Sequence, residues 1–250
     1  MTTIEDRIGG GLSPALQGIL HEAGALAGPL GYRAFVVGGV VRDLLLGQKT
    51  FDLDIVVEGE GIPFAQDLAG RLQARLKSHE RFGTATLIFP DGLRVDVAPA
   101  RTEVYDRPAA LPRVTPGSIR DDMGRRDFTI NAMAASLMPG EFGRLLDDFR
   151  GLRDLREGRI RVLHEKSFLD DPTRIFRAVR FESRLGFRIV RSTKALIDEA
   201  LSLRILDDLE DYRVAAELRL ILGEPDPAGA VRRRAALGVL DAVGNRSARD

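Results

Sequence analysis

Two aspartates in a short apolar segment, Asp52 and Asp54, are the residues of this chain most suited to metal chemistry. They lie in the run 51–57, whose apolar residues predict a β-strand. Residues two apart in a strand point to the same face, so the two carboxylates are expected to project together. Adjacent carboxylates repel each other unless a cation joins them, and Mg²⁺ prefers hard oxygen ligands of this kind. The alternative is a solvated Asp-x-Asp on an edge strand.

A glycine turn that precedes this strand favours the metal site over that alternative. The apolar run 35–37 ends at Gly38 and Gly39, and the residues that follow predict a helix. The first N–H groups of a helix lack internal partners and attract anions, and glycine lets a phosphate approach the backbone closely. Arg42 lies one turn into this helix. A phosphate site beside paired carboxylates predicts metal-bridged nucleotidyl transfer.

A third carboxylate, Asp96, is a candidate member of the same site. The runs 84–89 and 93–97 predict two strands, and the Pro90-Asp91-Gly92 sequence between them predicts a hairpin turn. Asp96 lies in the middle of the second strand. It could complete the metal site or accept the proton of an attacking hydroxyl, and the alternative is an exposed strand aspartate.

The Arg125-Arg126-Asp127 cluster, which runs into an apolar segment, is a candidate phosphate or ribose contact. A guanidinium can bind phosphate through paired hydrogen bonds, and Asp127 is expected to fix the orientation of Arg126. The alternative is a structural salt bridge at the start of a helix.

A stripe of charged residues recurs at every third position on a predicted helix that ends near residue 184, and it consists of Asp171, Arg174, Arg177 and Arg180. Asp170 or Asp171 is expected to cap this helix, because Pro172 suits its first turn. Cytosine and adenine both present an amino group beside an unprotonated ring nitrogen, whereas uracil and guanine do not. Asp171 could accept from the amino group while Arg174 donates to the ring nitrogen. The alternative is a ladder of surface salt bridges.

Apolar periodicity predicts the elements that must position these residues. Residues 1–12 are expected to lack regular structure, and the polar, proline-containing segment 101–122 is expected to be a loop. Around residues 145–155 the pattern changes from strand-like to helical, and 159–163 is the only later run that is still typical of a strand. A domain boundary is therefore expected near residue 142, between domains 1–142 and 143–250. Further helices are expected from the cap at Ser13 to 27, and over 62–77, 196–201, 209–222 and part of 225–243, with fraying at 245–250.

Composition excludes several classes of protein. The 250 residues carry no net charge, so any nucleic-acid site must be a local patch. The chain has no cysteine and only three scattered histidines, which argues against a thiolate or His-based zinc site and against a Ser-His triad. No apolar run is long enough to span a membrane and the N-terminus lacks a signal-peptide pattern, so a cytoplasmic protein without a membrane partner is expected.

Several motifs together resemble the signature of the class II CCA-adding tRNA nucleotidyltransferases and bacterial poly(A) polymerases, within the polymerase-β-like nucleotidyltransferase superfamily. They are Gly-Gly-Val-Val-Arg-Asp-Leu-Leu-Leu-Gly at 38–47, Asp-Leu-Asp at 52–54, and Arg-Arg-Asp-Phe-Thr-Ile-Asn-Ala at 125–132. Two weaker matches are the stretch 145–155, with Phe149 where proline is usual, and Arg213 with Glu217, where Tyr212 replaces a usual glutamate. The resemblance covers roughly 34–240. It implies an α+β head with a small mixed or antiparallel sheet, followed by an all-α neck that reads the base.

The resemblance also implies the site residues. Asp52 and Asp54 would bind Mg²⁺ and act in catalysis together with Asp96. Segment 101–122 would be the family's flexible loop. Because Tyr212 departs from the family's pattern, Arg213 is expected to support the preceding helix without a catalytic role. The implied nucleotide-binding residues are Gly38, Gly39, Arg42, Arg126, Asp171, Arg174, Arg177 and Arg180.

The implied activity is template-independent addition of C, A or both from CTP and ATP to the 3′ end of tRNA. The alternatives are a poly(A) polymerase and a non-catalytic nucleotide-binding or RNA-binding module of the same fold. The motifs are common to CCA, CC-only, A-only and poly(A) addition, and they carry no prediction of oligomeric state. Because family members usually continue with further helical domains, the chain is expected to be a truncated form or a short member.

Overall fold

The computed structural model describes residues 3–50, 52–224 and 226–239. Backbone contacts divide the chain into two compact units. The first unit comprises the chain up to Glu103 together with Val114–Arg126 and Ile130–Leu152. The second comprises Val104–Arg113, Asp127–Thr129 and the chain from Arg153 onwards. The chain therefore passes between the units several times, and the functional boundary near residue 142 remains a prediction.

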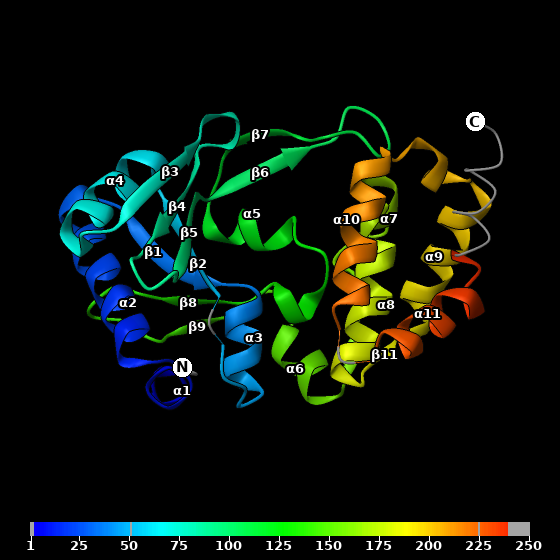
Figure 1. Cartoon of the computed structure of the whole chain (residues 1–250), viewed down its shortest axis with the longest axis horizontal. Helices are drawn as coiled ribbons and strands as arrows, with labels where there is room; N and C mark the ends of the chain where they lie inside the picture. The colour runs from blue at the N-terminus through cyan, green and yellow to red at the C-terminus, as the bar shows by residue number, and fades with distance from the viewer. Residues whose placement is uncertain (1–2, 51, 225, 240–250) are drawn as a thin grey trace. The chain divides into compact units, whose positions relative to one another are not determined.

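A seven-stranded mixed sheet forms the centre of the first unit (Figure 1). Its strands β2 and β5 are parallel, and all other neighbouring strands are antiparallel. The sheet and its helices confirm the predicted α+β class. In spatial order the strands are β3 (Arg75–His79), β4 (Thr84–Ile88), β5 (Arg94–Pro99), β2 (Leu53–Glu58), β1 (Arg33–Val37), β8 (Ala134–Ser136) and β9 (Leu145–Leu146).

Helix α4 (Gly61–Leu72) covers one face of β3, β4 and β5, and α2 (Pro14–Ala27) packs against α4 and β1 (Figure 1). The strand residues alternate accordingly, because successive side chains point to opposite faces. Leu87 and Val95 are fully buried, whereas their neighbours Arg94 and Asp96 are exposed. The part of the sheet formed by β3, β4 and β5 thus presents an exposed, largely polar face on the side away from α4.

The N-terminal segment corrects one prediction, because residues 5–11 are helical rather than irregular. Helix α1 (Glu5–Gly11) is flanked by Ile4 and Leu12, and both of these are buried together with Ile8. Their four-residue spacing places one apolar face against the unit. The predicted cap of α2 is confirmed, since Ser13 Oγ accepts from the Leu16 N–H at 3.3 Å.

The helix predicted over 62–77 is shorter than expected, which is a second correction. It ends at Leu72, because Gln73 has a left-handed φ of 53°. The chain then enters the edge strand β3, where Leu76 pairs with Leu87 of β4. The hairpin predicted at Pro90-Asp91-Gly92 is confirmed between β4 and β5.

The segment 101–122 contains more regular structure than predicted. Strands β6 (Arg101–Val104) and β7 (Arg113–Pro116) pair in a two-stranded sheet, in which the hydroxyls of Thr102 and Thr115 lie 2.6 Å apart. Helix α5 (Ile119–Gly124) follows and begins with a capping box formed by Ser118 and Asp121. Side-chain pairing and capping therefore order a segment whose apolar pattern is weak.

The second unit is mainly helical, and α8 packs against α10 and α11 (Figure 1). The prediction of an all-α domain needs one correction, because β10 (Arg159–Ile160) and β11 (Arg188–Ile189) pair in parallel. The predicted helices near 196–201, 209–222 and 225–243 are confirmed as α9, α10 and α11. The helices from residue 151 onwards are α6 (Gly151–Arg156), α7 (Ser167–Asp170), α8 (Thr173–Leu185), α9 (Arg191–Ser202), α10 (Asp211–Leu222) and α11 (Pro227–Ala236).

Four short 3₁₀ helices complete the regular structure that is described: Gly28–Leu30, Glu80–Phe82, Thr129–Asn131 and Ile205–Asp208. The fraying predicted for 245–250 lies outside the described residues. No helix in the described ranges has both the length and the apolar character needed to cross a membrane.

Candidate active site

Asp54 on β2 and Asp96 on β5 are register partners in the parallel strand pair, and Asp52 immediately precedes β2. All three side chains reach solvent. Protein atoms nevertheless crowd the Asp54 carboxylate, and this partial desolvation raises its pKa. The negative charges of Asp96 and Asp52 act in the same direction, while Arg126 opposes them. The structure therefore brings the three predicted carboxylates to one end of one sheet face.

The donor set fits a hard divalent cation held mainly by two carboxylates. Among the residues that the structure describes, no hydrogen-bond donor contacts the carboxylate of Asp52 or Asp54, whereas Asp96 Oδ1 accepts from Thr86 Oγ1 at 2.6 Å. A cation would relieve the repulsion that raises the pKa of Asp54. The described residues contain no group of three or more acidic, His or Cys side chains already arranged as a metal site. A metal held by Asp52 and Asp54 would thus take its other ligands from water or substrate.

The glycine turn lies directly against the Arg126 side chain. Gly38 has a φ of 74°, a conformation that favours glycine, and it precedes the short helix α3 (Gly39–Leu45). A Cβ at this position would lie 2.5 Å from Nη1 of Arg126. The turn therefore requires glycine both for its backbone conformation and for the close approach of the guanidinium.

Arg126 is held by Asp122, a residue that the sequence analysis did not select. Arg126 Nη2 donates to Asp122 Oδ2 at 2.9 Å, and Arg125 Nη2 donates to Oδ1 at 2.6 Å. Burial of Asp122 would raise its pKa, but Arg126 and Arg125 together outweigh that effect and hold the pKa below its usual range. The spacing of three and four residues was the signal that could have identified Asp122, since it places these side chains on one helix face.

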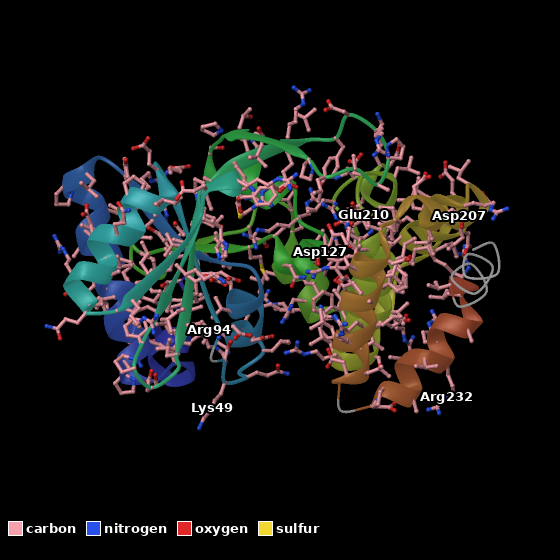
Figure 2. All side chains as sticks on the ribbon, turned by 45° about the horizontal axis from the view of Figure 1, so that its top comes forward. Lys49, Arg94, Asp127, Asp207, Glu210 and Arg232 are labelled. Carbon is pink, nitrogen blue, oxygen red and sulfur yellow. The ribbon has the colours of Figure 1, made fainter. Side chains whose placement is uncertain are left out.

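Orientation of Arg126 by Asp127 remains a prediction, since the partner that the structure gives Arg126 is Asp122. Asp127, labelled in Figure 2, instead accepts from Nε and Nη2 of Arg177 at 2.8 and 2.6 Å within the second unit. The negative charge of Asp127 raises the pKa of Arg177.

Arg126 also has a donor without a partner among the described residues. Its Nε is buried and makes no hydrogen bond with the described residues. Leaving a buried donor unpaired costs about 1–3 kcal/mol. A guanidinium that contacts the glycine turn, influences the pKa of Asp54 and retains an unpaired donor is suited to bind an anionic ligand such as a phosphate.

Arg42 is buried inside the first unit and hydrogen-bonded to neighbouring side chains. It is 3% exposed, and its guanidinium donates to both carboxylate oxygens of Asp43 and, at 2.6 Å, to Asn131 Oδ1. The Cβ position of Gly39 lies 3.6 Å from its Nη2. These contacts support the turn from inside the unit, and nucleotide binding by Arg42 remains a prediction.

In the second unit, the two oxygens of Asp171 have different surroundings. Oδ1 accepts from the N–H and the hydroxyl of Thr173 at 3.1 and 2.6 Å, and from Arg213 Nη2 at 2.8 Å. Oδ2 lies 3.9 Å from Nε of Arg174 and accepts no hydrogen bond from the described residues. Asp171 thus holds the first residue of α8 through Oδ1 and keeps Oδ2 available beside the guanidinium of Arg174. The base-reading prediction requires such an acceptor.

The other arginines of the stripe are paired inside the second unit. Nε of Arg180 lies 3.9 Å from Glu217 Oε2, and its Nη1 donates to Glu224 Oε1 at 3.4 Å. Burial raises the pKa of Glu217, while the positive charges of Arg177 and Arg180 oppose that shift. Contact of Arg174, Arg177 and Arg180 with nucleotide remains a prediction.

Arg213 has the supporting role that the sequence suggested. Besides its bond to Asp171, its Nη1 donates to the backbone carbonyl of Ala109 at 2.8 Å. It therefore links Asp171, just before α8, to the segment 104–113 of the same unit.

Comparison with known proteins identifies the family to which these motifs belong. The family model of the poly A polymerase head domain matches residues 34–161. An A-adding tRNA nucleotidyltransferase of Geobacter sulfurreducens is 50% identical over 222 residues, which are 89% of this chain and 25% of that protein. A CC-adding tRNA nucleotidyltransferase of Deinococcus radiodurans is 40% identical over 221 residues, which are 88% of this chain and 58% of that protein.

A solved structure of the Thermotoga maritima CCA-adding enzyme complexed with tRNA is similar to this chain with a TM-score of 0.86 and 41% identity. The match covers 96% of this chain and 55% of that one, so the chain spans at most about three fifths of the length of these relatives. The matched region includes the glycine turn, the three carboxylates and Arg126, and it carries the predicted polymerase-β-like head. The chain therefore belongs to the family of the class II CCA-adding tRNA nucleotidyltransferases and bacterial poly(A) polymerases.

Proposed function

We propose that this chain carries the catalytic and nucleotide-selecting part of an enzyme that adds A, C or both from ATP and CTP to the 3′ end of tRNA. The observation that carries the proposal is the register pairing of Asp54 with Asp96, beside Asp52 and within the electrostatic reach of Arg126. This arrangement has the carboxylates for a metal and the guanidinium for a triphosphate. A cytoplasmic location, where tRNA and nucleoside triphosphates are both available, belongs to the same proposal.

In the proposed reaction the 3′ hydroxyl of the RNA attacks the α-phosphorus of the incoming nucleotide. A new phosphorus–oxygen bond forms, the bond to the diphosphate breaks, and the hydroxyl proton leaves for Asp96 or for water. Mg²⁺ bound by Asp52 and Asp54 would lower the pKa of the hydroxyl and neutralise charge on the triphosphate. Arg126 and the turn at Gly38 and Gly39 would hold the phosphates.

Selection of the base is assigned to the second unit. The free Oδ2 of Asp171 accepts from the amino group of adenine or cytosine, and the Arg174 guanidinium donates to the adjacent ring nitrogen. Uracil and guanine present a carbonyl and an N–H in these places, so both contacts fail. The A-adding relative is more similar than the CC-adding one, with 50% against 40% identity, so A addition is the first activity to test.

The deciding experiment supplies the chain with tRNA that lacks one, two or all three terminal nucleotides, together with each nucleoside triphosphate in turn, and sequences the RNA ends. Addition of a single A to tRNA ending in CC supports A addition. Long A tails on many RNAs would instead identify a poly(A) polymerase. Nucleotide binding without any transfer, equal in wild type and Asp54→Asn, would identify a non-catalytic module.

A further inference from the structure

A lysine continues the row formed by Asp54 and Asp96 across the exposed face of β5, β4 and β3. Lys77 of β3 pairs with Thr86 of β4, Thr86 pairs with Asp96 of β5, and Asp96 pairs with Asp54 of β2. Directly paired residues point to the same face, and the bond from Thr86 Oγ1 to Asp96 confirms this for the middle of the row. Since neighbouring strands are 4.7–4.9 Å apart, Lys77 lies roughly 14 Å from Asp54 along this row.

A second row runs beside the first and adds two arginines. Arg75 of β3 pairs with Ile88 of β4, and Ile88 pairs with Arg94 of β5, which is labelled in Figure 2. Arg75, Lys77 and Arg94 are all exposed, and we call them the cationic surface. None of the three forms an ion pair with residues in the part of the chain that the structure describes.

Protection of the sheet edge explains only part of this pattern. Charged side chains on an edge strand prevent pairing with other chains, and β3 is an edge strand. Arg94, however, lies on β5, which has β4 on one side and β2 on the other. Arg94 has no ion pair with the described residues, lies in one row with Arg75 and is one row away from Lys77, so its position needs a different explanation.

We propose that the cationic surface binds the phosphate backbone of the acceptor RNA immediately upstream of its reacting 3′ hydroxyl. This inference rests on the proposed function. Asp96, the candidate proton acceptor, lies between Asp54 and Lys77 in the first row, and Arg94 lies two positions before Asp96 on the same strand. An RNA strand that places its hydroxyl beside Asp96 and continues towards β4 and β3 would therefore pass over the cationic surface. The nucleotide phosphates are assigned to Arg126 and the Gly38 turn, which leaves these cations for the RNA. With no net charge on the chain, RNA affinity must come from local groups of this kind.

The test measures RNA binding without nucleotide, so that it does not depend on catalysis. The probe is an RNA hairpin with a single-stranded 3′ end in CC, titrated with the full chain at several salt concentrations. The triple variant Arg75→Gln, Lys77→Gln, Arg94→Gln should lower the slope of log K against log salt by about two, since each phosphate contact on a single strand contributes about 0.7. Affinity at low salt should fall about tenfold or more, while the KM for ATP and the kcat at saturating RNA stay unchanged.

Two further variants make the result specific. Arg71→Gln removes a charge from α4, the helix that covers the opposite face, and should leave the slope unchanged; the Arg71 side chain is 48% exposed. Ile88→Arg adds a cation between Arg75 and Arg94 and should raise the slope by about 0.7.

A triple variant with the same slope of log K against log salt as wild type would overturn the proposal. An Arg71→Gln variant whose slope falls as much as that of the triple variant would overturn it too. A raised KM for ATP with unaltered RNA binding would assign the surface to the nucleotide phosphates instead. If the chain binds RNA through this surface but transfers no nucleotide, the proposed function fails while the inference about the surface stands.

Discussion

Asp122 holds Arg126 in place from a fully buried position, with a distance of 2.9 Å between its Oδ2 and Arg126 Nη2. The substitution Asp122→Asn keeps the shape of the side chain but removes the negative charge that pairs with the guanidinium groups of Arg125 and Arg126. We expect a loss of about 3 kcal/mol in the free energy of unfolding, the usual cost of breaking a buried ion pair, and a KM for ATP raised about tenfold. Urea unfolding and steady-state kinetics measure the two effects. A variant with wild-type stability and KM would show that Asp122 does not position Arg126.

The same carboxylate predicts a pH dependence of stability. Its pKa is lower in the folded protein than the ordinary 3.8, so its contribution is present above pH 3.8 and is lost as the pH falls through the folded value. Wild type should therefore lose more stability than Asp122→Asn on acidification below about pH 4. Chemical unfolding at a series of pH values tests this, and parallel curves for the two proteins would contradict it.

Removal of the Asp54 carboxylate should separate activity from stability. Asp54→Asn is expected to abolish transfer, because it removes one of two proposed metal ligands. In wild type the pKa of Asp54 is raised in the folded protein, so its ionised carboxylate disfavours folding at neutral pH. The variant lacks this charge and should therefore unfold at an equal or higher temperature. Added Mg²⁺ should raise the melting temperature of wild type but not of the variant. Near-normal transfer in Asp54→Asn would remove the catalytic assignment.

Gly38→Ala should damage the phosphate site through geometry alone. The new Cβ would meet Arg126 Nη1 at 2.5 Å, and the backbone conformation of φ 74° and ψ −128° disfavours alanine by roughly 1–3 kcal/mol. We expect lower stability and a raised KM for nucleotide. The matched control is Gly18→Ala in α2, where nothing lies within 4 Å of the new Cβ and the helix should gain up to about 1 kcal/mol. Equal effects of the two substitutions would contradict the special role of Gly38.

Asp171→Ala tests how the base is read. The variant loses the acceptor for the amino group, so discrimination of A and C against U and G should fall by about 1–3 kcal/mol, the usual value of a good bidentate contact. Competition between nucleoside triphosphates measures this ratio. Arg213→Gln serves as the companion variant, because it loosens Asp171 without removing it and should give a smaller loss. Full selectivity in Asp171→Ala at a reduced rate would place base reading elsewhere.

The sequence predicted the parts of the site that depend on local spacing. Asp52 and Asp54 are two positions apart in a strand-like run, and Gly38 follows directly after an apolar run. These local patterns were enough to identify the three positions from the sequence. The ion pair of Arg126 with Asp122 follows from their helical spacing of four residues, a signal that the sequence also contains. The four-residue spacing of Ile4, Ile8 and Leu12 is typical of an amphipathic helix, so the sequence also contained the pattern that predicts α1.

Contacts between distant segments could not be predicted in the same way. Arg177 and Asp127 are fifty positions apart, and only the folded chain shows that they pair. The edge strand β3 has few apolar residues, so its pairing with β4 determines its structure more than its own composition does. Arg94 gained significance only when the register placed it beside the carboxylates.

The unequal surroundings of the two Asp171 oxygens have a consequence for entropy. Three donors fix Oδ1, so the side chain loses its rotational freedom when the protein folds and not when a nucleotide arrives. The remaining oxygen therefore meets each base as a rigid acceptor, and little ordering free energy is subtracted from the contact. Base preference should consequently vary little with temperature, in contrast to a selector that must fold around its ligand.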